Sequence, residues 1–262
     1  MATNIIPAAR QSTIVDLIKK DGLVTVEALS KILNVSVITV RRDLSVLEEK
    51  GLLARTHGGA VFVKPIERES YYSEKDRRNK EQKESIGKAA ADLVEDGDTV
   101  FINSGSTTYQ VLRFLESKKD VTIITNNAAA VADFGGKSGV ELILTGGVYR
   151  HQSNCLIGDF AVNTVNMVVA SKIILGVDGL CFKEGLTSPV YQEAGITKTM
   201  IERTQGQVIC VADSSKIGKV TNFVISPLSV LDILVTDWLF DEELKPGFEE
   251  LNIKIINSKE DK

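Results

Sequence analysis

Cysteine and histidine are scarce in this sequence. Among its 262 residues are two histidines and three cysteines, Cys155, Cys181 and Cys210, which lie far apart and form no CxxC pair. Structural zinc sites and disulfide frameworks need such residues at short, repeated spacings. We therefore expect no metal site, we predict no cofactor, and we expect the cysteines to stay reduced, as they do in the cytoplasm.

Long apolar runs are missing as well. No stretch approaches the roughly 20 apolar residues that a membrane-spanning helix needs, and the N-terminal segment lacks the apolar core of a signal peptide. Hydrophobic residues make up 43% of the chain and charged residues 25%, as in ordinary globular domains. We expect a cytoplasmic protein that does not bind a membrane.

A large excess of positive charge, which many nucleic-acid-binding proteins carry, is also lacking. The formal net charge is −4. The distribution is uneven, however, because residues 1–60 hold eight Lys and Arg against six Asp and Glu, and the surplus of acidic residues lies in the rest of the chain. Any contact with DNA must then depend on a few well-placed arginines rather than on a strong general attraction.

Two short helices joined by a tight turn are predicted in the N-terminal part of the chain. Thr25 suits the cap of the first helix and Ser36 that of the second, because a hydroxyl accepts a hydrogen bond from a free backbone N–H group there. In the second helix, Val40, Leu44 and Leu47 are spaced so that they share one buried face. This arrangement is typical of a helix–turn–helix, whose second helix enters the major groove of DNA.

A small hairpin is predicted directly after the second helix. Two apolar runs flank a Gly-Gly pair, which suits a tight turn, and Arg55 and His57 lie near its tip. On the helix, Thr39, Arg41 and Arg42 project opposite the apolar face. Two adjacent arginines are usually no more than a solvated helix surface. A basic helix followed by a basic hairpin, however, indicates a winged helix–turn–helix.

Residues 35–60, VSVITVRRDLSVLEEKGLLARTHGGA, resemble the N-terminal domain of the DeoR/GlpR family of bacterial transcriptional regulators. They fit the family pattern S-x-x-T-(I/V)-R-R-D-L-x-x-L-E-x-x-G-x-(L/I)-x-R-x-H-G-G-A without a gap. The DNA-facing residues that this resemblance implies are Ser36, Val37, Thr39, Arg41, Arg42, Arg55 and His57.

After about residue 80, short apolar segments alternate with amphipathic ones. The expected strands are residues 99–103, 121–125, 141–145, 172–177, 208–212, 233–236 and 254–256, and the expected helices are residues 80–95, 107–116, 128–134, 158–167, 192–204 and 241–251. Continuous apolar strands separated by helices predict a mainly parallel, Rossmann-like sheet covered on both faces. The fold class is therefore α/β, with a small winged helix–turn–helix domain in front.

Polar and small residues follow five of these strands, and in parallel sheets ligands bind at the carboxyl ends of strands. Hydroxyl groups and the free N–H groups of a following helix suit an anion, and a lysine suits a phosphate. The expected phosphate-binding residues are Ser104, Gly105, Ser106, Thr107, Thr108 and Lys216. The expected residues for hydroxyl groups of the same ligand are Asn103, Asn126, Gly147, Asp178 and Glu193. Each feature alone also has an ordinary explanation, such as a helix cap or a turn.

The C-terminal part is similar to the sensor domain of DeoR-family regulators, which resembles ribose-5-phosphate isomerases in fold. The matching motifs are SGSTT, TNN, LTGG, GVDG, the EG-x-T segment at residues 184–187, Glu193 and ADSSK. One departure is Asn103, where the family commonly has Asp, so that an anionic acceptor is lost. We expect a winged helix–turn–helix domain over residues 1–62, a linker over 63–80, where charge is high and apolar periodicity is weak, and a sensor domain over 81–262.

The function that follows is a transcriptional regulator, expected to be a repressor of a carbohydrate catabolic operon. Its expected partners are double-stranded operator DNA and a phosphorylated sugar, and paired half-sites in the operator imply a homodimer or homotetramer. One alternative is an aldose–ketose isomerase with Glu193 as general base and Lys216 stabilising an enediolate. A second alternative is an adaptor that binds a protein. Because neither explains the DNA-reading segment, we expect no catalytic residues.

Overall fold

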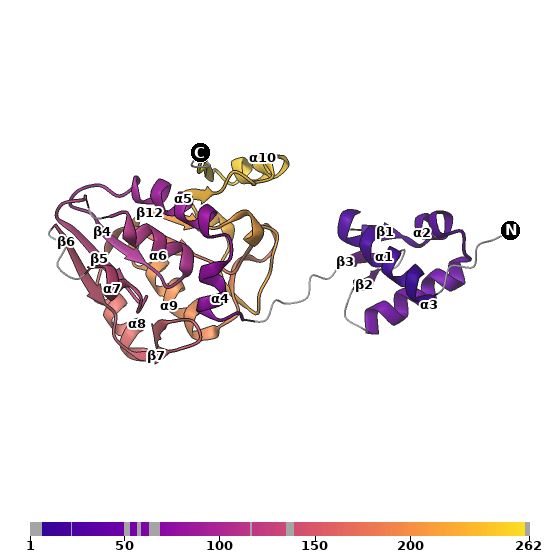
Figure 1. The fold of residues 1–262 in the computed structure, drawn as a ribbon, viewed down its shortest axis with the longest axis horizontal. Helices are drawn as coiled ribbons and strands as arrows, with labels where there is room; N and C mark the ends of the chain where they lie inside the picture. The colour runs from indigo at the N-terminus through magenta and orange to yellow at the C-terminus, as the bar shows by residue number, and fades with distance from the viewer. Residues whose placement is uncertain are drawn as a thin grey trace. The chain divides into compact units, whose positions relative to one another are not determined.

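The computed structural model describes residues 7–21, 23–49, 53–56, 59–62, 69–115, 117–134 and 139–259. By its internal contacts the chain divides into two compact units, Met1–Glu67 and Arg68–Lys262 (Figure 1). Each unit has its own hydrophobic core, so each is described by itself.

The N-terminal unit is a three-helix domain with a small antiparallel sheet. Its elements are α1 (Pro7–Asp21), β1 (Leu23–Thr25), α2 (Val26–Leu33), α3 (Val37–Glu49), β2 (Leu53–Thr56) and β3 (Gly59–Phe62). The strands lie in the order β1-β3-β2, so β1 joins the hairpin that β2 and β3 form. The predicted helix–turn–helix and hairpin are therefore confirmed.

The sequence signals that begin and end these helices act as expected. Thr25 Oγ1 accepts a hydrogen bond from the Ala28 N–H at 3.2 Å, and Ser36 Oγ accepts one from the Thr39 N–H at 3.2 Å. Asn34 ends α2 in the left-handed conformation, with φ of 51°, which asparagine tolerates better than most residues. The predicted apolar face of α3 is buried in the core of this unit.

The C-terminal unit is built on a seven-stranded parallel sheet in the order β15-β14-β12-β9-β4-β5-β6. These strands are β4 (Thr99–Ile102), β5 (Val121–Thr125), β6 (Val140–Leu144), β9 (Ala170–Gly176), β12 (Thr204–Val211), β14 (Ile233–Thr236) and β15 (Lys254–Asn257). All seven predicted strands are present, and the Rossmann-like α/β fold is confirmed.

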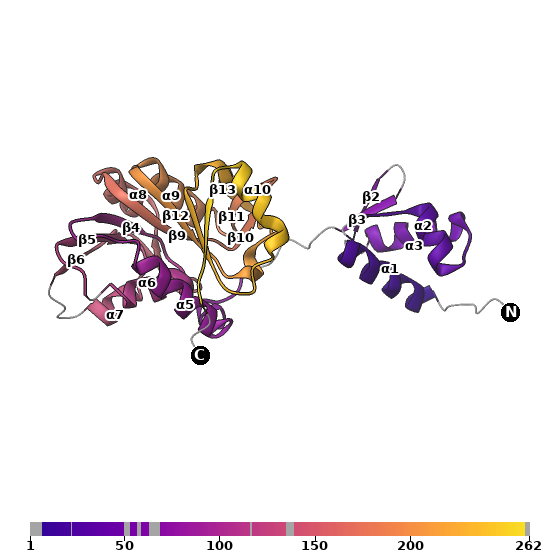
Figure 2. The same cartoon turned by 90° about the horizontal axis from the view of Figure 1, so that it is seen from above.

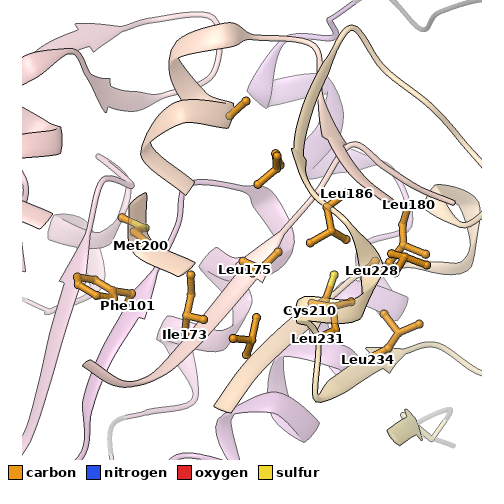
Figure 3. Close-up of a cluster of buried hydrophobic side chains, with 14 of the residues drawn as sticks. Phe101, Ile173, Leu175, Leu180, Leu186, Met200, Cys210, Leu228, Leu231 and Leu234 are labelled. Atoms are coloured by element: carbon orange, nitrogen blue, oxygen red, sulfur yellow. The ribbon is translucent and has the colours of Figure 1, made fainter. Parts of the chain in front are cut away.

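Helices cover both faces of this sheet (Figure 2). The helices of this unit are α4 (Tyr72–Arg77), α5 (Lys80–Ala91), α6 (Ser106–Arg113), α7 (Ala130–Phe134), α8 (Asp159–Asn166), α9 (Tyr191–Glu202) and α10 (Lys245–Glu250), with short 3-10 turns η1 (Ser214–Lys216), η2 (Leu228–Val230) and η3 (Glu242–Leu244). The core under α8 and α9 includes Phe101, Leu175 and Met200 (Figure 3), whereas α5 and α6 cover a second core on the opposite face.

Two features of this unit were not predicted. A small antiparallel sheet has the order β10-β11-β13, from β10 (Gly179–Cys181), β11 (Gly185–Ser188) and β13 (Phe223–Ser226), and β7 (Val148–Arg150) pairs with β8 (Cys155–Ile157). These strands have three or four residues each, which is too short for an alternating pattern to stand out. The segment 241–251, expected as one helix, is divided into η3 and α10.

Candidate functional site

The order in which the chain adds strands to the sheet reverses between β4 and β9. From β4 the chain proceeds to β5 and β6 on one side, and it then returns to β9 on the other side. Connections that leave two neighbouring parallel strands in opposite directions open a crevice at their carboxyl ends, where α/β proteins bind ligands. A small pocket lies there, lined by Asn103, Ser104, Gly176, Val177, Asp178, Ser188, Glu193, Thr197 and Ile225. Four of the expected ligand residues therefore meet at one place.

Asn103 bridges the two strands that form the base of this pocket. Its Oδ1 accepts a hydrogen bond from the Gly176 N–H at 2.8 Å, and its Nδ2 donates to the Gly176 carbonyl at 3.0 Å and to Thr197 Oγ1 at 3.1 Å. Both N–H donors of the amide are thus used within the protein. The structure gives Asn103 a strand-bridging role at the base of the pocket, and its contact with a ligand hydroxyl stays a prediction.

Two other expected ligand residues hold the loop after β4 in shape. The Thr108 hydroxyl is fully buried and donates to the Asn103 carbonyl at 2.8 Å. The Asn126 amide is also fully buried, accepting a hydrogen bond from the Ser104 N–H at 2.8 Å and donating to the Leu156 carbonyl at 3.2 Å. Because these polar groups are satisfied by the protein itself, the structure does not support ligand contacts for either side chain.

The remaining residues of that loop fit the anion cradle expected from the sequence. The helix α6 begins at Ser106, after Gly105 in an extended conformation. The first N–H groups of a helix have no partner within it, so those of Ser106 and Thr107 remain for an anion. The Ser104 side chain is half-buried beside the pocket. Ser104, Gly105, Ser106 and Thr107 therefore remain candidate phosphate ligands.

Two lysines share one carboxylate beside the pocket. Lys75 Nζ lies 2.5 Å from Asp178 Oδ1, and Lys216 Nζ lies 3.9 Å from the same oxygen. Lys75 belongs to α4, and Lys216 ends η1, which Asp213 caps by accepting a hydrogen bond from the Ser215 N–H. Asp178 and Lys216 were expected at this site. Lys75 was not, because it lies in a charged segment without periodicity.

A third lysine, Lys83, is buried behind α4. Its Nζ donates to the carbonyls of Lys75 and Arg78, the latter at 2.7 Å. Burial lowers the pKa of Lys83 from 10.5 to about 8, and the nearby Asp213 carboxylate opposes this shift. Lys83 therefore fixes the end of α4 beside α5. Because its pKa is lowered, a fraction of the molecules carries an uncharged Lys83 near neutral pH.

The second carboxylate of the pocket, Glu193, comes from the first turn of α9. Burial raises the pKa of Glu193 above its ordinary value. Arg150 Nη1 lies 3.5 Å from its Oε1, and the Cys155 thiol donates to the same oxygen at 3.6 Å. Burial also raises the pKa of Cys155 to about 12, so the sulfur stays protonated and is no nucleophile.

Gly147 lies outside this pocket. Its φ of +112° is unfavourable for residues with a side chain, and an added Cβ would come within 2.5 Å of the Ile157 carbonyl. The close approach of β8 thus explains this glycine, and the structure does not support the expected contact with a ligand. The sheet order also separates β6, the strand before it, from β9 by two strands.

Comparisons with known proteins cover almost the whole chain. Residues 10–65 match the family model described as DeoR-like helix-turn-helix domain, and residues 78–238 match the DeoR C terminal sensor domain. The chain belongs to the DeoR family. It is therefore a DNA-binding transcriptional regulator and not an enzyme, as the sequence predicted.

Several DeoR-family regulators are similar along their full length. The regulator GlpR of Haloferax volcanii is 32% identical over 97% of this chain and 98% of its own. GolR of Listeria innocua is 30% identical over 95% and 98%, and the repressor GlcR of Bacillus subtilis is 29% identical over 96% of each. A ribose-5-phosphate isomerase in complex with phospho-erythronic acid is a distant structural match, with 16% identity, a TM-score of 0.39 and coverage of 53% of this chain and 54% of that one.

In this DeoR-family chain the candidate DNA-binding surface is the outer face of α3. Arg41 and Arg42 are exposed there, and the hydroxyls of Ser36 and Thr39 are 2.9 Å apart at its N-terminus. Arg55 lies in β2, while its side chain and His57 fall outside the described residues. Within the described part of the chain, no group of residues is arranged to hold a metal ion, and no helix is long and apolar enough to cross a membrane.

One expected DNA-facing residue is placed differently. Val37, the first residue of α3, is half-buried and packs against the core of the N-terminal unit. Its neighbour Ile38 is 79% exposed. The sequence pattern could not separate the two, because both are β-branched aliphatic residues at the start of the same helix. The structure replaces Val37 by Ile38 on the outer face.

Proposed function

We propose that this DeoR-family regulator represses a carbohydrate catabolic operon and is controlled by a phosphorylated sugar bound at the pocket between β4 and β9. The observation that carries this proposal is the pairing of Lys75 and Lys216 with one oxygen of Asp178 beside a polar pocket. Lys75 contacts this oxygen at 2.5 Å and Lys216 at 3.9 Å, so Lys216 has the weaker pairing, and an anionic phosphate would give it a closer partner.

The phosphate is proposed to lie over the N-terminus of α6. Ser104, Gly105, Ser106 and Thr107 supply hydroxyl and backbone N–H donors there, and Lys216 supplies a charge. Lys75 joins this set because it contacts the same carboxylate as Lys216. Asp178 and Glu193 then accept hydrogen bonds from sugar hydroxyls, since an ionised carboxylate has no donor and can only accept.

Repression fits the name of GlcR, which is described as a transcriptional repressor. Control by a ligand requires that it bind one state of the regulator more tightly than another, because equal affinity for both shifts nothing. We further propose a homodimer or homotetramer in the cytoplasm, because operators read by helix–turn–helix proteins have paired half-sites. Light scattering on the purified chain tests the oligomeric state, and a monomer at operator-binding concentrations contradicts it.

The effector is tested with matched pairs of ligands. We expect at least one phosphate from a panel of hexose and pentose phosphates to raise the melting temperature and to change operator affinity, whereas the corresponding free sugar does neither. Lys216→Ala should abolish both effects and keep DNA binding, and Lys254→Ala, at an exposed lysine of the edge strand β15, is the matched control. A panel without any active phosphate contradicts the sugar-phosphate assignment, and an equal response to a free sugar contradicts the phosphate contact.

A further inference from the structure

At the start of α3, two neighbouring aliphatic side chains lie in different environments. Val37 packs against the core of the N-terminal unit, whereas Ile38 is 79% exposed. An isoleucine left in water contributes little to folding, because the stabilisation by apolar side chains comes from the area that they bury. The exposure of Ile38 is therefore not explained by the fold of this unit.

Ile38 belongs to a surface that is otherwise polar. Among the residues of α3 whose side chains the structure describes, the exposed ones are Ile38, Arg41, Arg42 and Glu48, and Ile38 is the one apolar residue of these four. Residues three and four positions apart lie on the same side of a helix, which places Ile38 next to both arginines. Arg41 and Arg42 suit phosphates or guanine edges, so the apolar side chain lies within a surface whose charge is complementary to DNA.

The position of Ile38 within the helix is the one from which bases are read. In helix–turn–helix proteins the N-terminal residues of the second helix contact base edges, while the first helix crosses the DNA backbone. Ile38 is the second residue of α3. Its hydrocarbon side chain can make no hydrogen bond, so the group that it suits in the major groove is apolar. Among the groups that the four bases present in the major groove, the apolar one is the C5 methyl group of thymine.

We propose that Ile38 contacts the methyl group of a thymine in the operator and is a specificity-determining residue. The proposal rests on DNA binding by this family and adds a base preference to it. Contact with the methyl group predicts selectivity at one base pair of each half-site. Contact of Ile38 with the sugar–phosphate backbone instead predicts a loss of affinity on every sequence alike.

The test uses the full chain and duplex DNA. Binding sites are first selected from random duplexes with the wild-type protein, and each thymine of the selected site is then replaced singly by deoxyuridine, which lacks only the methyl group. We expect the wild type to lose about fourfold in affinity at one thymine of each half-site, the factor for removing one methyl group from an apolar contact. Ile38→Ala should bind the thymine and deoxyuridine duplexes equally, and Ile38→Val should keep most of the difference.

Control variants make each outcome decisive. Ile32, on α2, is 59% exposed, and Ile32→Ala should keep the wild-type response to deoxyuridine. If no thymine shows a loss that depends on Ile38, or if Ile38→Ala weakens binding equally on all duplexes, the proposal is wrong. Failure of the wild-type protein to select any duplex would instead contradict its DNA-binding function, so the two failures are distinguished.

Discussion

Arg150 binds Glu69 through both of its terminal nitrogens, and it lies 3.5 Å from Glu193 in the pocket between β4 and β9. Glu69 is the first residue described after the boundary between the two units. Lys75, six residues later, pairs with the other pocket carboxylate, Asp178. The segment that leads from the DNA-binding unit is thus held at two points by groups that contact the pocket.

The first prediction concerns this connection. Glu69→Gln removes the charge that holds Arg150, so we expect the sugar phosphate still to raise the melting temperature while its effect on operator affinity falls several-fold. Glu74→Gln is the control, because Glu74 is exposed and lies 4.0 Å from its partner Arg78. Operator binding is titrated with and without ligand. An unchanged ligand effect in Glu69→Gln would show that this ion pair plays no part in the response.

The second prediction concerns pH and Lys83. Its pKa is about 8 in the folded protein and 10.5 in the unfolded chain, so between these values the unfolded chain holds a proton that the folded chain has lost. The free energy of unfolding must then rise with pH over this window, relative to that of Lys83→Met. Urea unfolding followed by Trp238 fluorescence measures it in the C-terminal unit, which contains the single tryptophan.

The control for this measurement is the exposed Lys80. Lys80→Met should follow the wild type across the same pH range, because an exposed lysine has similar surroundings in both states. Parallel pH profiles for the wild type and Lys83→Met would contradict the lowered pKa of Lys83.

The third prediction concerns Asn103. In Asn103→Asp a carboxylate oxygen replaces the Nδ2 group that donates to the Gly176 carbonyl. Two oxygen acceptors then face each other, and a buried donor bond is lost. We expect a loss of about 1–3 kcal/mol in the free energy of unfolding of the C-terminal unit. Asn126→Asp is a second test of the same kind, because its Nδ2 donates to the Leu156 carbonyl. A neutral effect of Asn103→Asp would contradict the strand-bridging role.

The parallel sheet was predictable because its strands are buried on both faces, which leaves continuous apolar runs in the sequence. The strand at Val121–Thr125 and the strand at Ile233–Thr236 agree with the prediction at both ends. The helix caps Thr25 and Ser36 were predictable for a similar reason, since a cap depends on residues within three positions.

The individual roles of polar residues at the strand ends were less predictable. Whether Asn126 faces a ligand or the protein depends on Leu156, thirty residues later, and no local pattern encodes that contact. Lys75 was missed because its partner Asp178 is distant in sequence and the surrounding residues are charged. The sequence therefore located the edge of the sheet that carries the pocket, but not which polar groups remain available there.

The last prediction concerns Arg41. Its side chain is exposed on the outer face of α3, away from the buried ion pair that Asp43 of the same helix forms with Arg10 at 2.5 Å. Arg41→Ala should therefore weaken operator binding by about 1–3 kcal/mol, the range for a bidentate contact with a base, and leave the melting temperature unchanged. Arg10→Ala should instead lower the melting temperature, because it leaves the Asp43 carboxylate buried without its partner and destabilises the N-terminal unit. Binding is measured by fluorescence anisotropy on the selected duplex, and Lys31→Ala on α2 serves as the charge control. If Arg41→Ala binds as tightly as the wild type, Arg41 lies outside the interface with DNA.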